Sequence, residues 1–136
     1  EGYEPDEDIV KRAKKIAKKT ECRMKQTHSP KKAVKNATII YTDAFVSMGE
    51  EDQVDKMADF DGFQVNMELL EAAEEDWSFM HCLPAHRGDE VTDEVMDHKQ
   101  SIVFDQAENR MWAQMSLITY FCNKAAWETL AEFLDL

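Results

Sequence analysis

Residues 38–42 read Thr-Ile-Ile-Tyr-Thr, a run of β-branched and aromatic side chains that ends at Asp43. A short apolar run of this kind, bounded by polar residues, is typical of a buried strand in a parallel sheet. Two later runs share its character: residues 77–80 (Trp-Ser-Phe-Met) and residues 101–104 (Ser-Ile-Val-Phe). We therefore expect three core strands, at these three places in the chain.

Helical patterns separate the predicted strands. Asp6 is the expected N-cap of a helix over residues 6–20, and Ser29 with Pro30 starts another that runs to Asn36. Further helices are expected at residues 52–59, 67–74, 94–96 (capped by Thr92), 106–122 and 124–134, with short extended pieces at 22–27 and 63–65. Alternating strands and helices predict βαβ units, so the expected fold class is α/β, a Rossmann-like parallel sheet with flanking helices on both faces.

The composition is that of a globular domain. The 136 residues suffice for one domain, and 43% are hydrophobic and 32% charged, which argues against disorder. No apolar run approaches the roughly 18–20 residues of a membrane span, and no charged-then-apolar leader opens the chain. Cys22, Cys82 and Cys122 form no C-x-x-C pair, which argues against a zinc site or a disulfide framework. We expect a cytoplasmic protein with no metal, no cofactor and no membrane partner.

The formal net charge of −12 hides an asymmetry, because the first 40 residues carry +5 and the remainder −17. The strongly negative charge of residues 41–136 argues against nucleic acid as a partner, since phosphate binding needs lysine and arginine. The basic run at residues 11–19 is either a patch for nucleic acid or membrane, or the solvated face of a helix. We favour the helix face, because apolar residues that would be buried recur at helical spacing. These are Ile9, Ala13, Ile16 and Ala17.

A polar segment follows each of the three predicted strands. The segments are residues 43–49 (Asp-Ala-Phe-Val-Ser-Met-Gly), 81–84 (His-Cys-Leu-Pro) and 105–110 (Asp-Gln-Ala-Glu-Asn-Arg). In open α/β sheets, ligands bind beyond the carboxyl ends of the strands. If the sheet is parallel, the three segments therefore converge on one crevice.

Three side chains in these segments offer distinct chemistry. Asp43 can pair with an ammonium group, Cys82 can act as nucleophile, base or hydrogen-bond partner, and Arg110 presents a planar cation to a carboxylate, phosphate or polarised carbonyl. Each also has a structural interpretation: a turn residue, a buried thiol and a surface ion pair. The coincidence of all three segments favours function. His81 and His86 have no third ligand in a suitable pattern, so no metal site is expected.

These segments resemble three motifs of the ornithine carbamoyltransferases. Residues 43–49, with Ser-Met-Gly at their end, resemble the ornithine-binding loop of that family. Residues 81–88 resemble its HCLP motif, and residues 104–110 resemble the AENR segment that opens its final helices. The order and spacing also match, and the similarity runs from Gly2 to about Gln114. The HCLP cysteine separates this family from the aspartate carbamoyltransferases.

The resemblance implies both a reaction and a set of roles. The family transfers the carbamoyl group of carbamoyl phosphate to the δ-amine of L-ornithine, which gives citrulline and phosphate. Asp43 would hold the α-ammonium of ornithine, and Cys82 would contact the reacting amine and take part in its deprotonation. Leu83 and Arg110 would hold the carbamoyl group. The resemblance also implies substrate-binding roles for Ser47, Met48 and His81.

Two motifs of the family do not occur in this sequence. Its carbamoyl-phosphate site uses a Ser-x-Arg-Thr and a His-Pro-x-x-Gln segment on an N-terminal domain, and neither pattern is found here. We therefore expect residues 1–136 to form a partial ornithine-binding domain, lacking its first strand–helix unit and the whole carbamoyl-phosphate domain. The chain alone is expected to be inactive, to need that domain and to form homo-oligomers.

Two other functions stay open from the sequence. One is a non-catalytic amino-acid-binding or regulatory fragment, and the other is a carbamoyltransferase for another amine. Asp43, Ser47 and Met48 favour an α-amino acid over putrescine, which has no α-ammonium group.

The last two predicted helices carry an apolar stripe, formed by Met111, Met115, Ile118, Phe121, Cys122, Leu130, Phe133 and Leu134. In the family this region packs against the N-terminal domain. Without that domain the stripe is expected to be exposed and to promote self-association. The alternative is that these helices fold onto their own sheet.

Overall fold

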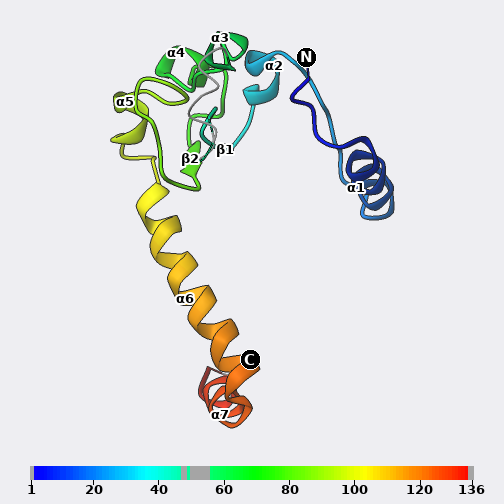
Figure 1. Cartoon of the computed structure of the whole chain (residues 1–136), viewed down its shortest axis with the longest axis vertical. Coiled ribbons are helices and arrows are strands. Elements are labelled where there is room, and N and C mark those ends of the chain that lie inside the picture. Colours follow the sequence, from blue (N-terminus) through cyan, green and yellow to red (C-terminus); the bar gives the residue numbers. More distant parts are fainter. Residues whose placement is uncertain (1, 47–48, 50–55, 135–136) are drawn as a thin grey trace.

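A computed structural model describes residues 2–46, 49 and 56–134 of the chain. Figure 1 shows three parts: a compact body, a long helix that leaves it towards the C-terminus, and a separate N-terminal helix. We call residues 29–103 the body and residues 104–134 the C-terminal arm. The elements are α1 (Glu7–Lys19), α2 (Pro30–Val34), β1 (Ile39–Thr42), α3 (Lys56–Asp59), α4 (Met67–Leu70), β2 (Ser78–His81), α5 (Asp93–Met96), α6 (Val103–Cys122) and α7 (Lys124–Leu134).

β1 and β2 lie side by side and run parallel, as the sequence predicts. Their register pairs Ile39 with Ser78 at one end and Thr42 with His81 at the other. The two strands therefore end at the same edge, which places Asp43 next to Cys82. The parallel sheet with flanking helices confirms the predicted fold class.

The predicted third strand, at residues 101–104, is wrong. Only Ser101 pairs with the sheet, through an isolated parallel bridge to Phe79, and α6 already begins at Val103. The Phe79 N–H donates to the Gln100 carbonyl at 3.0 Å and the Ile102 N–H to the Phe79 carbonyl at 2.9 Å. The Gln106 N–H then donates to the Ile102 carbonyl at 2.8 Å, which is a helical hydrogen bond. The first turn of α6 thus begins where the β-branched run predicts a strand.

Helix caps follow the sequence more closely than helix lengths do. Asp6, Ser29, Asn66 and Thr92 all cap helices as their residue types predict. The helix predicted over residues 67–74 ends at Leu70, because the chain beyond it bonds elsewhere. The Asn36 N–H donates to the Ala72 carbonyl at 2.9 Å, and the Glu74 N–H to the Ala37 carbonyl at 3.1 Å.

Two further boundaries differ from the prediction. Residues 22–27 form no strand, because they are exposed and pair with neither β1 nor β2. The helix predicted over residues 52–59 is seen as α3 from Lys56, and residues 52–55 lie outside the described part. Both C-terminal helices form, α6 starting three residues earlier than predicted.

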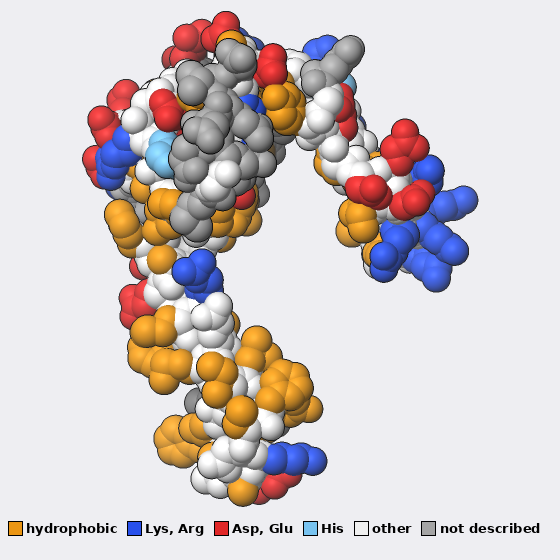
Figure 2. Space-filling view, in the orientation of Figure 1, with side chains coloured by type: hydrophobic (Ala, Val, Ile, Leu, Met, Phe, Trp, Pro, Cys, Tyr) orange, Lys and Arg blue, Asp and Glu red, His pale blue; other side chains and the backbone are white. Residues whose placement is uncertain are grey.

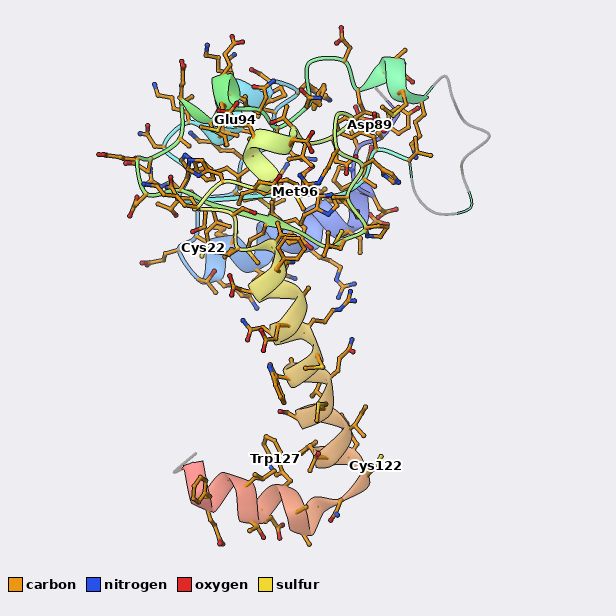
Figure 3. The ribbon with its side chains drawn as sticks, turned by 90° about the vertical axis from the view of Figure 1, so that its left-hand side faces the viewer. Cys22, Asp89, Glu94, Met96, Cys122 and Trp127 are labelled. Atoms are coloured by element: carbon orange, nitrogen blue, oxygen red, sulfur yellow. The ribbon has the colours of Figure 1, made fainter. Side chains whose placement is uncertain are left out.

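The hydrophobic core lies within the body, on one side of the two strands. Its buried members are Val34, Ile40, Val65, Leu70, Trp77, Phe79, Val91, Val95, Met96 and Val103. In β1 only Ile40 is buried, while Ile39 and Tyr41 are exposed, so this strand is not buried on both faces. Trp77 stacks on His98 with the ring centroids 4.8 Å apart. In Figure 3, Met96 lies in the interior of the body, while Asp89 and Glu94 lie at its rim.

The two outer parts expose their apolar side chains. α1 has no buried residue, and its Ile9 and Ile16 are exposed, so the prediction that they are buried is wrong for this chain. Figure 2 shows the basic side chains of α1 around a helix that stands clear of the body. The same view shows apolar side chains along the arm. Among the described residues, no helix is long and apolar enough to cross a membrane.

Candidate active site

The centre of the candidate site is a contact between Asp43, which follows β1, and Cys82, which follows β2. The Cys82 thiol donates a hydrogen bond to Asp43 Oδ1, with Sγ and Oδ1 2.8 Å apart. The backbone N–H of Ala44 donates to the same oxygen at 2.8 Å. The parallel register produces this contact, because it brings the two strand ends together across 39 residues of sequence.

This contact changes the acidity of both groups in opposite directions. The thiol hydrogen bond, and then the Ala44 N–H, hold the pKa of Asp43 below its ordinary value. Burial, and then the neighbouring Asp43 carboxylate, raise the pKa of the Cys82 thiol, which a hydrogen bond to Tyr41 partly opposes. In the unliganded chain Asp43 is therefore an anion, and Cys82 is a protonated thiol that donates to it.

A small cavity of about 190 Å³ lies beside the thiol. It is lined by Tyr41 from β1, by His81 at the end of β2 and Cys82 after it, and by three residues from the first turns of α6: Gln106, Ala107 and Arg110. Gln106 and Arg110 are four residues apart, so they lie on the same face of the helix. The three polar segments thus converge as predicted, although the third comes from a helix rather than from the end of a strand.

His81 is enclosed by protein on all sides. Its backbone N–H donates to Gln106 Oε1 at 3.0 Å, and its ring Nδ1 accepts a hydrogen bond from the Leu83 N–H at 2.9 Å. The second bond requires an unprotonated Nδ1, so the ring proton lies on Nε2. That nitrogen is 3.2 Å from Glu90 Oε1, within ion-pair distance but poorly aligned for a hydrogen bond.

Glu90 is a fully buried acid that the sequence did not single out. Besides its contact with His81, its Oε1 accepts a hydrogen bond from the His86 N–H at 2.6 Å. The His81 ring and the Glu90 carboxylate therefore tie the two ends of the segment 82–86 together. An isolated buried carboxylate is costly, so this acid depends on the donors around it.

Leu83 takes a left-handed backbone conformation, with φ of 57°. A non-glycine residue there costs roughly 1–2 kcal/mol, and the bond from its N–H to His81 offsets part of this cost. The result is a bend immediately after Cys82 that turns the following backbone away from the strand direction.

The structure brings together five of the seven predicted site residues: Asp43, His81, Cys82, Leu83 and Arg110. Ser47 and Met48 lie outside the described residues. Sequence reasoning missed Tyr41, Gln106 and Glu90. Tyr41 and Gln106 stand inside segments that were already singled out, whereas nothing local marks Glu90. Within the described part of the chain, no three His, Cys, Asp or Glu side chains are grouped to hold a metal ion, and all three cysteines are free.

Residues 1–121 match the family described as "Aspartate/ornithine carbamoyltransferase, Asp/Orn binding domain". The chain belongs to this carbamoyltransferase family. A curated relative from Halobacterium salinarum, named a catabolic ornithine carbamoyltransferase, is 50% identical over 125 residues, which cover 91% of this chain and 40% of the relative.

Solved carbamoyltransferase structures match the fold as well. The ornithine carbamoyltransferase of Pyrococcus furiosus is 49% identical with a TM-score of 0.81, over 87% of this chain and 38% of that one. The anabolic enzyme of Campylobacter jejuni is 30% identical with a TM-score of 0.82, over 91% of this chain and 41% of that one. This chain thus spans about two-fifths of the length of the relatives that it matches.

Proposed function

We propose that this chain supplies the ornithine side of an ornithine carbamoyltransferase site. The reaction transfers the carbamoyl group of carbamoyl phosphate to the δ-amine of L-ornithine, giving citrulline and phosphate. The observation that carries this proposal is the Asp43–Cys82 contact of 2.8 Å at the edge of the parallel sheet. It joins an anion that can hold an ammonium group to a thiol that can exchange a proton.

The chemistry follows from how these two groups affect each other. An alkyl ammonium has a pKa of about 10, and only its neutral form has a lone pair for attack. When the α-ammonium of ornithine pairs with Asp43, it replaces the thiol as partner of the carboxylate and neutralises its charge. Both effects remove what Asp43 contributes to the raised pKa of Cys82. The thiol can then release its proton to water, and the resulting thiolate can accept one proton from the δ-ammonium, which leaves the neutral amine.

The other predicted site residues have supporting roles in this proposal. Arg110 stabilises developing charge on the carbamoyl oxygen, and the backbone at Leu83 holds the carbamoyl group. Ser47 and Met48 close over the substrate. His81 supports the site indirectly, since its buried ring accepts a hydrogen bond from the Leu83 N–H.

The proposal extends to what must complete the site. Carbamoyl phosphate needs a second, N-terminal domain, and the whole protein is expected to be a cytoplasmic homo-oligomer that uses no cofactor. We expect residues 1–136 alone to form no citrulline, because they contain neither carbamoyl-phosphate motif. Citrulline formed by the purified chain, above that formed by a Cys82→Ala variant, would contradict this expectation.

Ligand choice tests the substrate assignment. Isothermal titration calorimetry should show that the chain binds L-ornithine more tightly than putrescine, and Asp43→Ala should abolish this preference. Equal affinity for the two amines in the parent chain, or an unchanged preference in the variant, would favour a carbamoyltransferase for another amine. Selective ornithine binding in a whole protein that forms no citrulline would favour a regulatory role.

A further inference from the structure

An aromatic cluster begins two residues after Asp43 and lies outside the hydrophobic core. Phe45 and Phe60 stack with ring centroids 4.7 Å apart and planes 8° from parallel. Tyr3 packs on Phe60 at 4.9 Å, and Phe63 meets Phe60 edge-on at 6.1 Å. The four rings come from three separate segments of the chain.

The stack is coupled to Asp43 through the backbone. Phe45 is two residues after Asp43, and the intervening Ala44 N–H donates to the Asp43 carboxylate at 2.8 Å. The position of the Phe45 ring therefore restricts how the chain can turn after β1, and this turn bears on the direction of the Asp43 side chain. The pair of nearly parallel rings holds that direction more narrowly than a loose apolar contact, because aromatic pairs have preferred geometries.

Phe60 is itself held from the N-terminal side of the molecule. The Tyr3 hydroxyl donates to Asp59 Oδ2 at 2.9 Å, next to the residue on which its ring packs. Ring contacts thus run from Tyr3 through Phe60 to Phe45, which is two residues from Asp43 in the sequence. The alternative is that the rings only bury apolar area. Against it, Tyr3 is 47% exposed, Phe45 and Phe60 are only half-buried, and none of the four rings belongs to the buried core.

We propose that Phe45 and Phe60 are positioning residues, which act by aiming the Asp43 carboxylate at Cys82, and that Tyr3 supports them from the N-terminal segment. The effect of this positioning on substrate binding rests on the proposed function, in which Asp43 is the partner of the α-ammonium of ornithine. The positioning itself does not rest on the proposed function, since the Asp43–Cys82 hydrogen bond exists without ligand.

The Cys82 thiol reports directly on where Asp43 lies. The groups that face it are Asp43, Tyr41, His81 and Arg110. Burial raises the pKa of this thiol first, and the Asp43 carboxylate raises it further. If the carboxylate turns away, the pKa of Cys82 should fall, as it should when the carboxylate is replaced by an amide.

The test is the pH dependence of Cys82 alkylation by iodoacetamide, with Cys22→Ser and Cys122→Ser to remove the two other thiols. Phe45→Leu and Phe60→Leu should lower the pH midpoint in the same direction as Asp43→Asn. We expect a shift of at least half a unit, which is about threefold in rate below both midpoints. Phe45→Leu combined with Asp43→Asn should shift the midpoint no further than Asp43→Asn alone.

Controls separate positioning from general loosening. Phe45→Tyr and Phe60→Tyr keep the rings and should keep the parental midpoint, and Phe121→Leu on the distant arm should do the same. Greater access to the thiol also lowers the midpoint, because burial is the largest cause of its raised pKa, but it does so equally in the Asp43→Asn background. A parental midpoint in both leucine variants, with far-ultraviolet circular dichroism unchanged, overturns the proposal, as does a shift that adds to that of Asp43→Asn. If a leucine variant does not fold, the same titration is made on Tyr3→Ala, which changes the half-exposed ring of the cluster. A lowered midpoint in that variant supports the proposal, and an unchanged midpoint overturns it.

A second measurement keeps this proposal distinct from the proposed function. If both hold, Phe45→Leu weakens L-ornithine binding by several fold and leaves putrescine binding unchanged. A lowered midpoint with unaltered ornithine binding supports the positioning and contradicts the assignment of Asp43 as the ammonium partner. Weakened ornithine binding with a parental midpoint overturns the positioning.

Discussion

Phe79 in β2 has no exposed surface, whereas Phe121 in α6 is 77% exposed and Phe133 in α7 is 85% exposed. All three stand in regular secondary structure, so local structure does not explain the difference. In the body, strands and short helices from several parts of the chain pack around Phe79 and the other core side chains. In the arm, α6 and α7 contact mainly each other, and Trp127 reaches back to Tyr120 with centroids 5.5 Å apart (Figure 3).

This contrast shows what backbone hydrogen bonds and side-chain burial contribute separately. A helix satisfies its own backbone groups wherever it lies, so α6 can extend away from the body. Burial needs a second surface, and the described part of this chain offers the arm none. The members of the apolar stripe whose burial is described, from Met111 to Phe133, are exposed, as the sequence predicts, and this excludes the alternative in which the arm folds onto its own sheet.

The largest expected effect comes from the same truncation in the two regions. Phe79→Ala should lower the free energy of unfolding by about 3–5 kcal/mol, because it leaves a cavity in a fully packed site. Phe121→Ala should change it by less than about 0.5 kcal/mol, since an exposed ring gives up little. Denaturant titration followed by circular dichroism measures both. Similar losses at the two positions would show that the arm is packed in solution.

A polar change within the body should have the next largest effect. Glu90→Ala removes the partner of the His81 ring and of the His86 N–H and leaves buried donors unpaired. We expect a loss of about 3 kcal/mol, as for other buried pairs broken on one side. Glu94→Ala, four residues along and exposed, is the matched control and should stay within about 0.5 kcal/mol. Equal stability of the two variants would remove Glu90 from its supporting role.

The arm should drive self-association of the 136-residue chain. Burying a phenylalanine contributes about 1.5–3 kcal/mol, so Phe121→Glu and Phe133→Glu should each weaken association at least about tenfold. Light scattering across a dilution series measures this, with Met24→Glu, an exposed apolar residue far from the arm, as control. A parent chain that is monomeric at every concentration would contradict the prediction.

Two helix caps give the smallest and most local contrast. Asp6 accepts hydrogen bonds from the Asp8 and Ile9 N–H groups at 2.9 and 3.1 Å, and α1 has no buried residue. Asp6→Ala should cost about 1 kcal/mol of helix stability and reduce helical circular dichroism without moving the unfolding midpoint of the body. Asn66→Ala, which uncaps α4 inside the body, should instead lower that midpoint. If Asp6→Ala lowered it equally, α1 would have to pack on the body.

The sequence was most informative where a residue type acts locally. The caps at Asp6, Ser29, Asn66 and Thr92 depend on a side-chain oxygen and the next few N–H groups, so they could be predicted one by one. The strand predicted at residues 101–104 is wrong, because a β-branched run is compatible both with a buried strand and with a partly buried first turn of a helix. Which of the two forms depends on whether the sheet offers the run a full partner edge.

The same distinction between local and long-range features applies to the candidate site. Its segments could be found from the sequence, since polar residues after predicted strands gather at one edge of a parallel sheet. Three features could not be found in this way: Asp43 accepts a hydrogen bond from the Cys82 thiol, Gln106 rather than a strand end reaches His81, and Glu90 is buried. These are contacts between residues up to 39 positions apart, and no local pattern encodes them.

By itself, then, the sequence determined the capped starts of α1, α2, α4 and α5, the parallel pairing of β1 with β2 and the three polar segments, because hydrogen-bonding and apolar periodicity are properties of neighbouring residues. The tertiary structure alone decided which apolar residues are buried, where α6 begins and how the acidities of Asp43 and Cys82 shift. Burial and electrostatics depend on what else lies within a few ångströms, and in a folded chain those neighbours come from distant parts of the sequence.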